Sequence, residues 1–315
     1  MVSTAIIVGA SMAHPSYASI LRDAERARWT LDDLTAGLVD LDFDRPFLSD
    51  ALVHGQRLPF LDAREQVLLT QIRAYTYLEL LTLAEKFVVP FVMAQAAKSL
   101  HGDIERFLAL MGFGQQAAKH MAAFARFASA VQLGGRAQCE LVATAEDITA
   151  SFLTHNTLAI GLLVLHCECI AQPHHVRAMR GRDEVDEQFR ELMRVHWREE
   201  AQNVQLVGLI LAELAQATSR HEHARAVQQY LAMLEALSTV FVSQVDLDLA
   251  AFERAARPLG DDERRQWRAE QSLSYDEVFL RYGVEHPLLR RTVEDSLGVP
   301  LAPLDEAARR FTVPP

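Results

Sequence analysis

The sequence has few of the residues that interrupt regular structure. It contains 14 glycines and 11 prolines among 315 residues, about 8% where roughly 12% is usual. Half of the residues are hydrophobic and 23% are charged, which excludes a disordered or fibrous chain. Few turn residues combined with much apolar sequence favour long helices over many short strands, and the length alone allows about two domains.

Cysteines and basic residues are also scarce. Three cysteines, Cys139, Cys167 and Cys169, exclude a disulfide framework and favour a reducing compartment. The balance of 31 Lys and Arg against 42 Asp and Glu gives a net charge of −11, the wrong sign for a protein that binds nucleic acid. The apolar start at residues 1–13 has no basic residue before it, so we expect no signal peptide. The most apolar interior run, residues 157–165, is too short to span a bilayer. We therefore expect a cytoplasmic protein without nucleic-acid or membrane partners.

Several familiar catalytic motifs are absent. The glycines in MGFG and QLGGRA lack the GK[ST] ending of a phosphate-binding loop, and no Gly-x-Ser-x-Gly turn is present for a hydrolase. His174 and His175 are expected in a solvated loop, and His221 and His223 are expected to cap a helix or to face water. The search for function therefore turns to ionisable residues within the helices.

Five long helical stretches follow a mixed N-terminal region. Residues 1–62 contain one short helical pattern, at 16–28, and we expect them to form an arm without a core of its own. Long helices are predicted at 62–98 with Pro90 inside, 103–130, 145–170, 184–217 and 221–256. Two shorter helices and a proline-rich end complete the chain. No strand-like alternation persists, so we predict an all-α protein built on a bundle of long helices.

Ionisable residues interrupt the apolar stripes of three of these helices. Glu85 lies among apolar residues at three- and four-residue spacings, so we predict that it points inward, with Glu79 on a more amphipathic face as the alternative. His120 has alanines and phenylalanines on its side of the second helix. Glu168 directly follows the apolar run IGLLVLHC. A buried carboxylate is costly unless it is paired or binds a metal.

The fourth helix has the richest pattern, RVHWREEAQNVQL. His196, Glu200 and Asn203 lie on one face, whereas Glu199 is expected to turn away. Four long helices that each direct a Glu or His inward form the architecture of di-iron carboxylate proteins, in which carboxylates and imidazoles hold the metal ions. The same residues could instead form a metal-free polar network, and this alternative stays open.

Several segments together resemble the p-aminobenzoate N-oxygenase family of ferritin-like di-iron oxygenases. They are LPFLDAREQVLLTQIRAYTYLELLTLAEKFVVPFV, FGQQAAKHMAAFARF, the helix ending in HCECI, and HWREEAQNVQL. They are spread over roughly residues 40–210, and the C-terminal FLRYGVEHPLLRR is similar to the family's ending. The resemblance implies a ferritin-like four-helix bundle at 63–257, with an N-terminal arm at 1–62 and a C-terminal helical extension at 258–315.

The resemblance also implies a set of metal ligands and two departures from it. The family has a Glu where this chain has Ala117, and a His where it has Asn203. Alanine offers no donor atom and asparagine only a neutral oxygen, so the remaining residues would hold one metal well and two poorly unless water or Gln116 compensates. The implied ligands are Glu85, His120, Glu168, His196 and Glu200.

By this resemblance the protein is expected to be a metal-dependent oxygenase or oxidase of the di-iron type. The implied cofactor is iron, as one or two ions with manganese or zinc possible, with dioxygen as co-substrate and a small organic molecule as substrate. A non-catalytic or mono-metal descendant that serves as a binding or interaction protein is the alternative, because of Ala117 and Asn203. A homodimer is possible, and ferritin-type iron storage is disfavoured.

Overall fold

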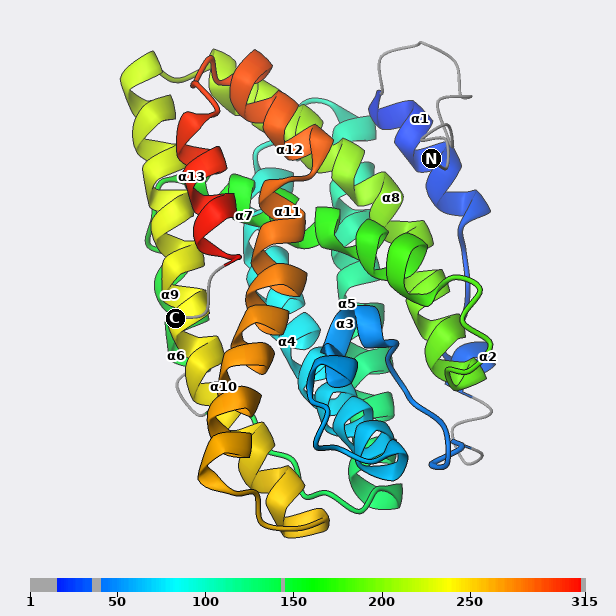
Figure 1. Ribbon diagram of the computed structural model, residues 1–315. Helices are drawn as coiled ribbons and strands as arrows, with labels where there is room; N and C mark the ends of the chain where they lie inside the picture. Colours follow the sequence, from blue (N-terminus) through cyan, green and yellow to red (C-terminus); the bar gives the residue numbers. More distant parts are fainter. Residues whose placement is uncertain (1–15, 36–40, 143–144, 313–315) are drawn as a thin grey trace.

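A computed structural model of the chain describes residues 16–35, 41–142 and 145–312. All regular elements in these ranges are helical, which confirms the prediction of an all-α protein (Figure 1). The apolar start at residues 1–13, for which we expected no signal peptide, lies outside the described residues.

Four long helices form the bundle. The first two pack as an antiparallel hairpin, the last two pack in the same way, and a long connection that contains α6 separates the two hairpins in the sequence. Two hairpins joined by one long crossover form the ferritin-like arrangement, so the predicted fold class is confirmed. The helices are α4 (Ala63–Ala97), α5 (Ile104–Gly134), α7 (Thr157–Pro173) and α8 (Glu187–Gln216), with the short α6 (Ala145–Phe152) in the crossover.

The starts of these helices follow from their capping residues. Asp62 accepts a hydrogen bond from the backbone N–H of Glu65, whose side chain accepts one from the Asp62 N–H, as the capping-box pattern predicts. Asp103 and Asp186 cap α5 and α8 in a similar way. Pro90 lies inside α4 without ending it. Local sequence therefore determines where the helices that carry the site begin.

Helices on both sides complete the molecule (Figure 1). Of the N-terminal helices, α1 and α2 contact α5 and α8, whereas α3 and η2 contact α4; α9 packs on α7 and contacts α10 and η4. We propose to keep the division at 62/63 and 257/258, because α4 begins and α9 ends close to these points. The flanking elements are α1 (Tyr17–Arg26), α2 (Leu31–Thr35), α3 (Asp50–Val53), η2 (Gly55–Arg57), α9 (Arg220–Ala255), α10 (Asp261–Tyr275), η4 (Asp276–Arg281), α11 (Tyr282–Val284), α12 (Pro287–Arg291), η5 (Thr292–Ser296) and α13 (Ala302–Arg310).

Two helix predictions need correction. The helix predicted at 145–170 is two helices, because the chain turns at 153–156 and the Asn156 side chain caps α7 at the backbone N–H of Leu158. The C-terminal part is also more helical than predicted, since α10, η4 and α11 follow one another without a gap from Asp261 to Val284.

Three histidines expected near solvent are buried. After α7 the chain continues as the π-helix η3 (His174–Met179) instead of a loop. His174 bonds the Tyr77 hydroxyl at 2.5 Å and the carbonyl of Val278 at 2.8 Å. His175 is buried against Trp197, and His223 bonds the carbonyls of Ala215 and Leu297. The predictions failed because the partners of these imidazoles lie on other segments of the chain: the Val278 carbonyl for His174, the Trp197 ring for His175 and the Leu297 carbonyl for His223.

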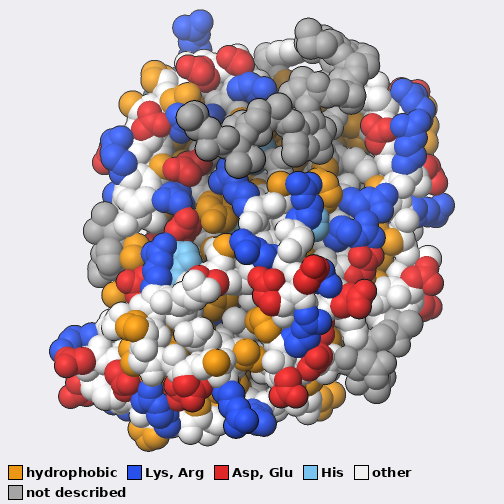
Figure 2. All heavy atoms as spheres, turned by 45° about the vertical axis from the view of Figure 1, so that its right-hand side comes forward, with side chains coloured by type: hydrophobic (Ala, Val, Ile, Leu, Met, Phe, Trp, Pro, Cys, Tyr) orange, Lys and Arg blue, Asp and Glu red, His pale blue; other side chains and the backbone are white. Residues whose placement is uncertain are grey.

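Two helices, α4 and α9, are long and apolar enough to pass a length-and-hydropathy test for a membrane span. About half of the most apolar window of each is buried inside the protein, 56% and 44%. Core helices pass the same test, so this is weak evidence for a span. Figure 2 shows one face of the molecule, where acidic and basic side chains are interspersed with scattered apolar ones.

Candidate metal centre

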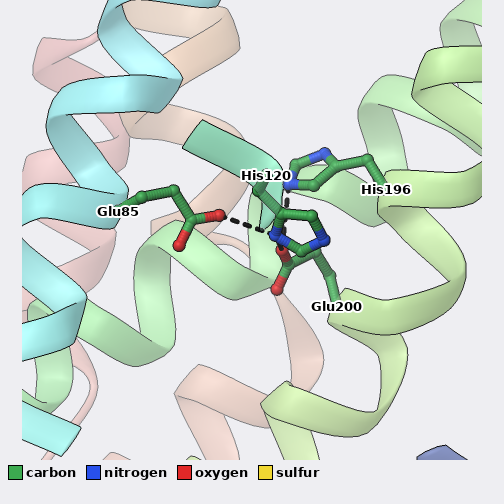
Figure 3. A group of neighbouring side chains, drawn as sticks. All are labelled: Glu85, His120, His196 and Glu200. Atoms are coloured by element: carbon green, nitrogen blue, oxygen red, sulfur yellow. Dashed lines mark hydrogen bonds and ion pairs between the residues drawn. The ribbon is translucent and has the colours of Figure 1, made fainter. Parts of the chain in front are cut away.

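The first helix of the bundle places one carboxylate in the interior. Glu85 is buried on α4, whereas Glu79, the alternative, is half-buried. Figure 3 shows the Glu85 side chain extending from α4 toward side chains of α5 and α8. The apolar neighbours of Glu85 turn this face of the helix toward the core, and the carboxylate follows them.

His120 lies at the centre of the site. Its Nδ1 is 2.8 Å from Glu85 Oε1 and 3.1 Å from Glu200 Oε1, and its Nε2 is 2.9 Å from Glu199 Oε2. The imidazole is only 1% exposed. Three carboxylates from two other helices thus surround one ring on α5.

The fourth helix contributes an imidazole and a carboxylate one turn apart. His196 Nε2 lies 2.9 Å from Glu200 Oε1, and Asn203, also buried, donates its amide N–H to Glu200 Oε2 at 3.1 Å. These residues share the face that their spacing predicted. One ligand atom from each of Glu85, His120, His196 and Glu200 lies within 4.8 Å of the others, and all four residues are buried (Figure 3).

Glu168 does not join this group. It is 3% exposed on α7, which agrees with the prediction of a buried carboxylate, but the group of four donors does not include it. Its Oε2 atom has no hydrogen-bond partner. Gln116 lines a void of about 20 Å³ that Asn203 also lines. Ala117, one turn before His120, is fully buried and provides no donor atom.

The sequence prediction for Glu199 was wrong. Glu199 is 1% exposed and bonds both His120 and the ammonium of Lys119, whose Nζ lies 2.6 Å from its Oε1. The signal was present in the sequence, because Glu199 lies four residues after Val195 and four before Asn203, both of which are buried. The buried stripe of α8 is therefore wide enough to take both adjacent glutamates inward.

Burial and the opposite charges act against each other in this cluster. Burial alone would lower the pKa of His120, but Glu85, Glu199 and Glu200 outweigh it and hold that pKa well above its ordinary value. Burial raises the pKa of Glu85 to about 7, although His120 opposes the rise. Burial and the His120 charge hold the pKa of His196 well below normal. Without a metal, His120 is therefore the protonated imidazole and His196 the neutral one.

The donor set suits a first-row transition metal. Imidazoles and carboxylates bind iron, manganese and zinc, and neutral imidazole is the ligating form of histidine. Two buried polar atoms of the cluster, Glu85 Oε2 and His196 Nδ1, have no hydrogen-bond partner. Such atoms are costly in a protein interior, and a cation beside Glu85 would remove the cost there. The residues therefore fit a metal ion.

Aromatic side chains separate the cluster from water. The Trp29 ring stacks on His120 with 6.2 Å between ring centres, and the Lys119 ammonium lies over the Trp29 ring, 4.0 Å from its centre. Phe124 meets His196 edge-on at 5.1 Å. Electrostatic interactions within this enclosure are stronger than in water, because the local dielectric constant is low.

An apolar cavity of about 70 Å³ lies against the stretches of α4 and α7 that contain Glu85 and Glu168. Ala84 and Cys167, the neighbours of Glu85 and Glu168 in the sequence, line it together with aromatic and aliphatic side chains. Burial and the nearby carboxylates of Glu85 and Glu200 raise the pKa of Cys167 to about 12, so its thiol stays neutral.

Comparisons with known proteins give structural likenesses only. No family model matches the chain, and no curated protein does. Three solved structures of R2-like ligand-binding oxidase resemble it at 13–15% identity, all with a Mn/Fe cofactor. One is a point mutant reconstituted aerobically, with a TM-score of 0.47, and the match covers 91% of this chain and 94% of that one. The second is a point mutant reconstituted anaerobically, with a TM-score of 0.46 and coverage of 81% and 90%. The third is a long-soak form, with a TM-score of 0.45 and coverage of 82% and 90%. Values of this size assign no residue role. The resemblance to the N-oxygenase family stays a prediction.

Proposed function

We propose that this protein is a metal-dependent oxidase or oxygenase that uses dioxygen to oxidise a small organic molecule. Glu85, His120, His196 and Glu200 hold the metal, which is iron or manganese. The observation that carries the proposal is the convergence of these four buried donors from three helices within 4.8 Å. When bound and reduced, such an ion supplies the electrons that activate dioxygen.

The protein's own groups prepare the site for this chemistry. Metal binding requires neutral imidazole, so the proton on His120 must leave when an ion enters. His196 is already neutral, because burial and the His120 charge lower its pKa. The Lys119–Glu199 ion pair beside the cluster holds Glu199 against the ring of His120. A carboxylate or carbonyl at the second nitrogen fixes a ligating imidazole and raises its basicity.

The apolar cavity favours a small, largely apolar substrate. Its lining offers almost no free polar group, because both nitrogens of His166, which faces it, are bonded to the Tyr230 hydroxyl and the Phe279 carbonyl. Together with the family resemblance, the apolar lining supports a small aromatic amine as the substrate class.

Oxygen consumption by metal-loaded protein tests the proposal. Protein loaded with ferrous iron without oxygen should consume dioxygen on mixing, and Glu85→Gln should abolish the uptake. Glu79→Gln on the same helix is the matched control and should leave it unchanged. With an aromatic amine and a reductant, label from ¹⁸O₂ should appear on the amine nitrogen. Equal oxygen uptake by wild type and Glu85→Gln would rule out the assigned site.

A second function is supported by the ionic network around His120. His120 contacts three carboxylates without any metal, as expected of a binding or interaction protein descended from the fold. Protein purified from iron-supplied cells with well below one metal per chain and no oxygen uptake would favour this alternative.

A further inference from the structure

The four converging donors have the composition of a single-ion site. Two imidazoles and two carboxylates lie within 4.8 Å of one another. Ligand atoms sit about 2.0–2.2 Å from such a metal, so donors on opposite sides of one ion are at most roughly 4.4 Å apart. A contraction of a few tenths of an ångström would therefore close the cluster around one cation. Two carboxylates also balance the charge of one divalent ion.

A second ion would lack the ligands that a paired site requires. Paired sites of this architecture use a Glu from each of two helices and a Glu-x-x-His motif from each of the other two. On α5 the first position of that motif is Ala117, which is fully buried and has no donor atom. On α8 the last position is Asn203, whose amide N–H is donated to Glu200 Oε2 and so occupies that oxygen.

The remaining carboxylates do not repair this loss. Glu199 is engaged by Lys119 and His120. Glu168 is buried but lies outside the group of four donors. Gln116 lines a void of about 20 Å³, room for roughly one water molecule. No described residue therefore replaces the missing bridge and the missing imidazole.

We infer that the site binds one divalent cation and not two, and that Ala117 and Asn203 set this number. The inference rests on the proposed function, because it concerns the same four ligands. Glu168 is not a ligand of this ion. Two imidazoles with carboxylates and open positions resemble the ligand sets of mononuclear non-haem iron oxygenases more than those of di-iron proteins.

Metal counting with Mn²⁺ alone tests the inference. Full-length protein loaded anaerobically with excess Mn²⁺ and then desalted should hold one ion per chain, with the six-line electron paramagnetic resonance spectrum of an isolated ion. The double variant Ala117→Glu/Asn203→His should hold two, with the broadened spectrum of a coupled pair. Two ions in wild type, or one in the folded double variant, would overturn the inference but leave the proposed function standing.

A matched pair of isosteric variants tests which carboxylates bind the ion, without adding new ligands. Glu168→Gln should keep one ion per chain with the Mn²⁺ dissociation constant changed by less than about 3-fold, whereas Glu200→Gln should weaken binding by about 100-fold. Equal weakening by both variants would make Glu168 a ligand and refute the site of four donors. Wild type that binds neither Mn²⁺ nor Fe²⁺ at any concentration would overturn both the inference and the proposed function.

Discussion

Replacing Gly283 by alanine tests how tightly the C-terminal helices are packed against the bundle. A Cβ atom at this position of α11 would overlap three ring atoms of His166 on α7. The imidazole cannot move freely, because its nitrogens lie 2.7 Å from the Tyr230 hydroxyl and 2.7 Å from the Phe279 carbonyl. The substitution must therefore shift the helix or break these hydrogen bonds.

The structure gives a rough size for this effect. Overpacking a well-filled interior costs about 1–3 kcal/mol, and leaving a buried polar group without its partner costs about 1–3 kcal/mol more. We expect Gly283→Ala to lower the free energy of unfolding by roughly 2–6 kcal/mol, a large part of the roughly 5–15 kcal/mol typical of a folded protein. Urea denaturation followed by circular dichroism measures it as a lower midpoint at unchanged slope.

Two controls isolate the contact with His166. Gly208 lies in α8 with no atom within 4 Å of an added Cβ, so Gly208→Ala should be neutral or stabilise by about 0.5–1 kcal/mol. In a His166→Ala background the clash is gone, so adding Gly283→Ala should cost less than about 1 kcal/mol. A Gly283→Ala protein as stable as wild type would refute the packing described for α11.

Three other predictions concern buried charges. Burial lowers the pKa of both His166 and His174 to about 4 in the folded protein. In the unfolded chain these histidines take up a proton below about pH 6.5. The folded protein should therefore have its full stability above that pH and lose about 2 kcal/mol per histidine by about pH 5. A urea midpoint that stays the same when the pH is lowered from about 7.5 to about 5 would contradict this prediction. Lys119→Met keeps the apolar stem but leaves Glu199 short of a partner, so thermal unfolding should show a loss of about 2 kcal/mol; an unchanged melting temperature would show that the ion pair contributes nothing. Asp248→Asn, in a buried network at α9, should cost roughly 3 kcal/mol in urea denaturation, whereas a neutral result would mean that the network tolerates loss of its charge.

The network around Asp248 has a clear physical basis. Its carboxylate accepts hydrogen bonds from Thr76 at 2.9 Å, Gln244 at 2.9 Å and Tyr275 at 2.5 Å. The Arg73 guanidinium lies 3.4 Å from the centre of the Tyr275 ring and lowers the pKa of Asp248, against the larger effect of burial. Removal of the carboxylate charge would therefore leave a nearly inaccessible guanidinium without compensation.

The sequence predicted the bundle and most of the cluster because both depend on local periodicity. A carboxylate such as Glu85 that sits on an apolar stripe must turn inward with the stripe. The same argument placed His120, His196 and Glu200, and it ranked Glu85 above Glu79 correctly. The helix starts followed from capping residues such as Asp62.

Contacts between distant segments were beyond such reasoning. Glu199 was expected to face solvent because its partner Lys119 lies 80 residues away on another helix. His174 looked like a loop residue because the Val278 carbonyl that holds it belongs to the C-terminal extension. Whether Glu168 would reach the other donors depends on the offset between α7 and α8, which no periodicity in either helix reveals.

The account depends most on a cation that binds where the acids and imidazoles meet. Crystals grown with iron or manganese and measured on both sides of the metal's absorption edge would locate it by anomalous scattering. The account predicts a peak between the Glu85 and Glu200 carboxylates, about 2.0–2.2 Å from nitrogens of His120 and His196. A map without such a peak, in which His120 still bonds three carboxylates, would contradict it.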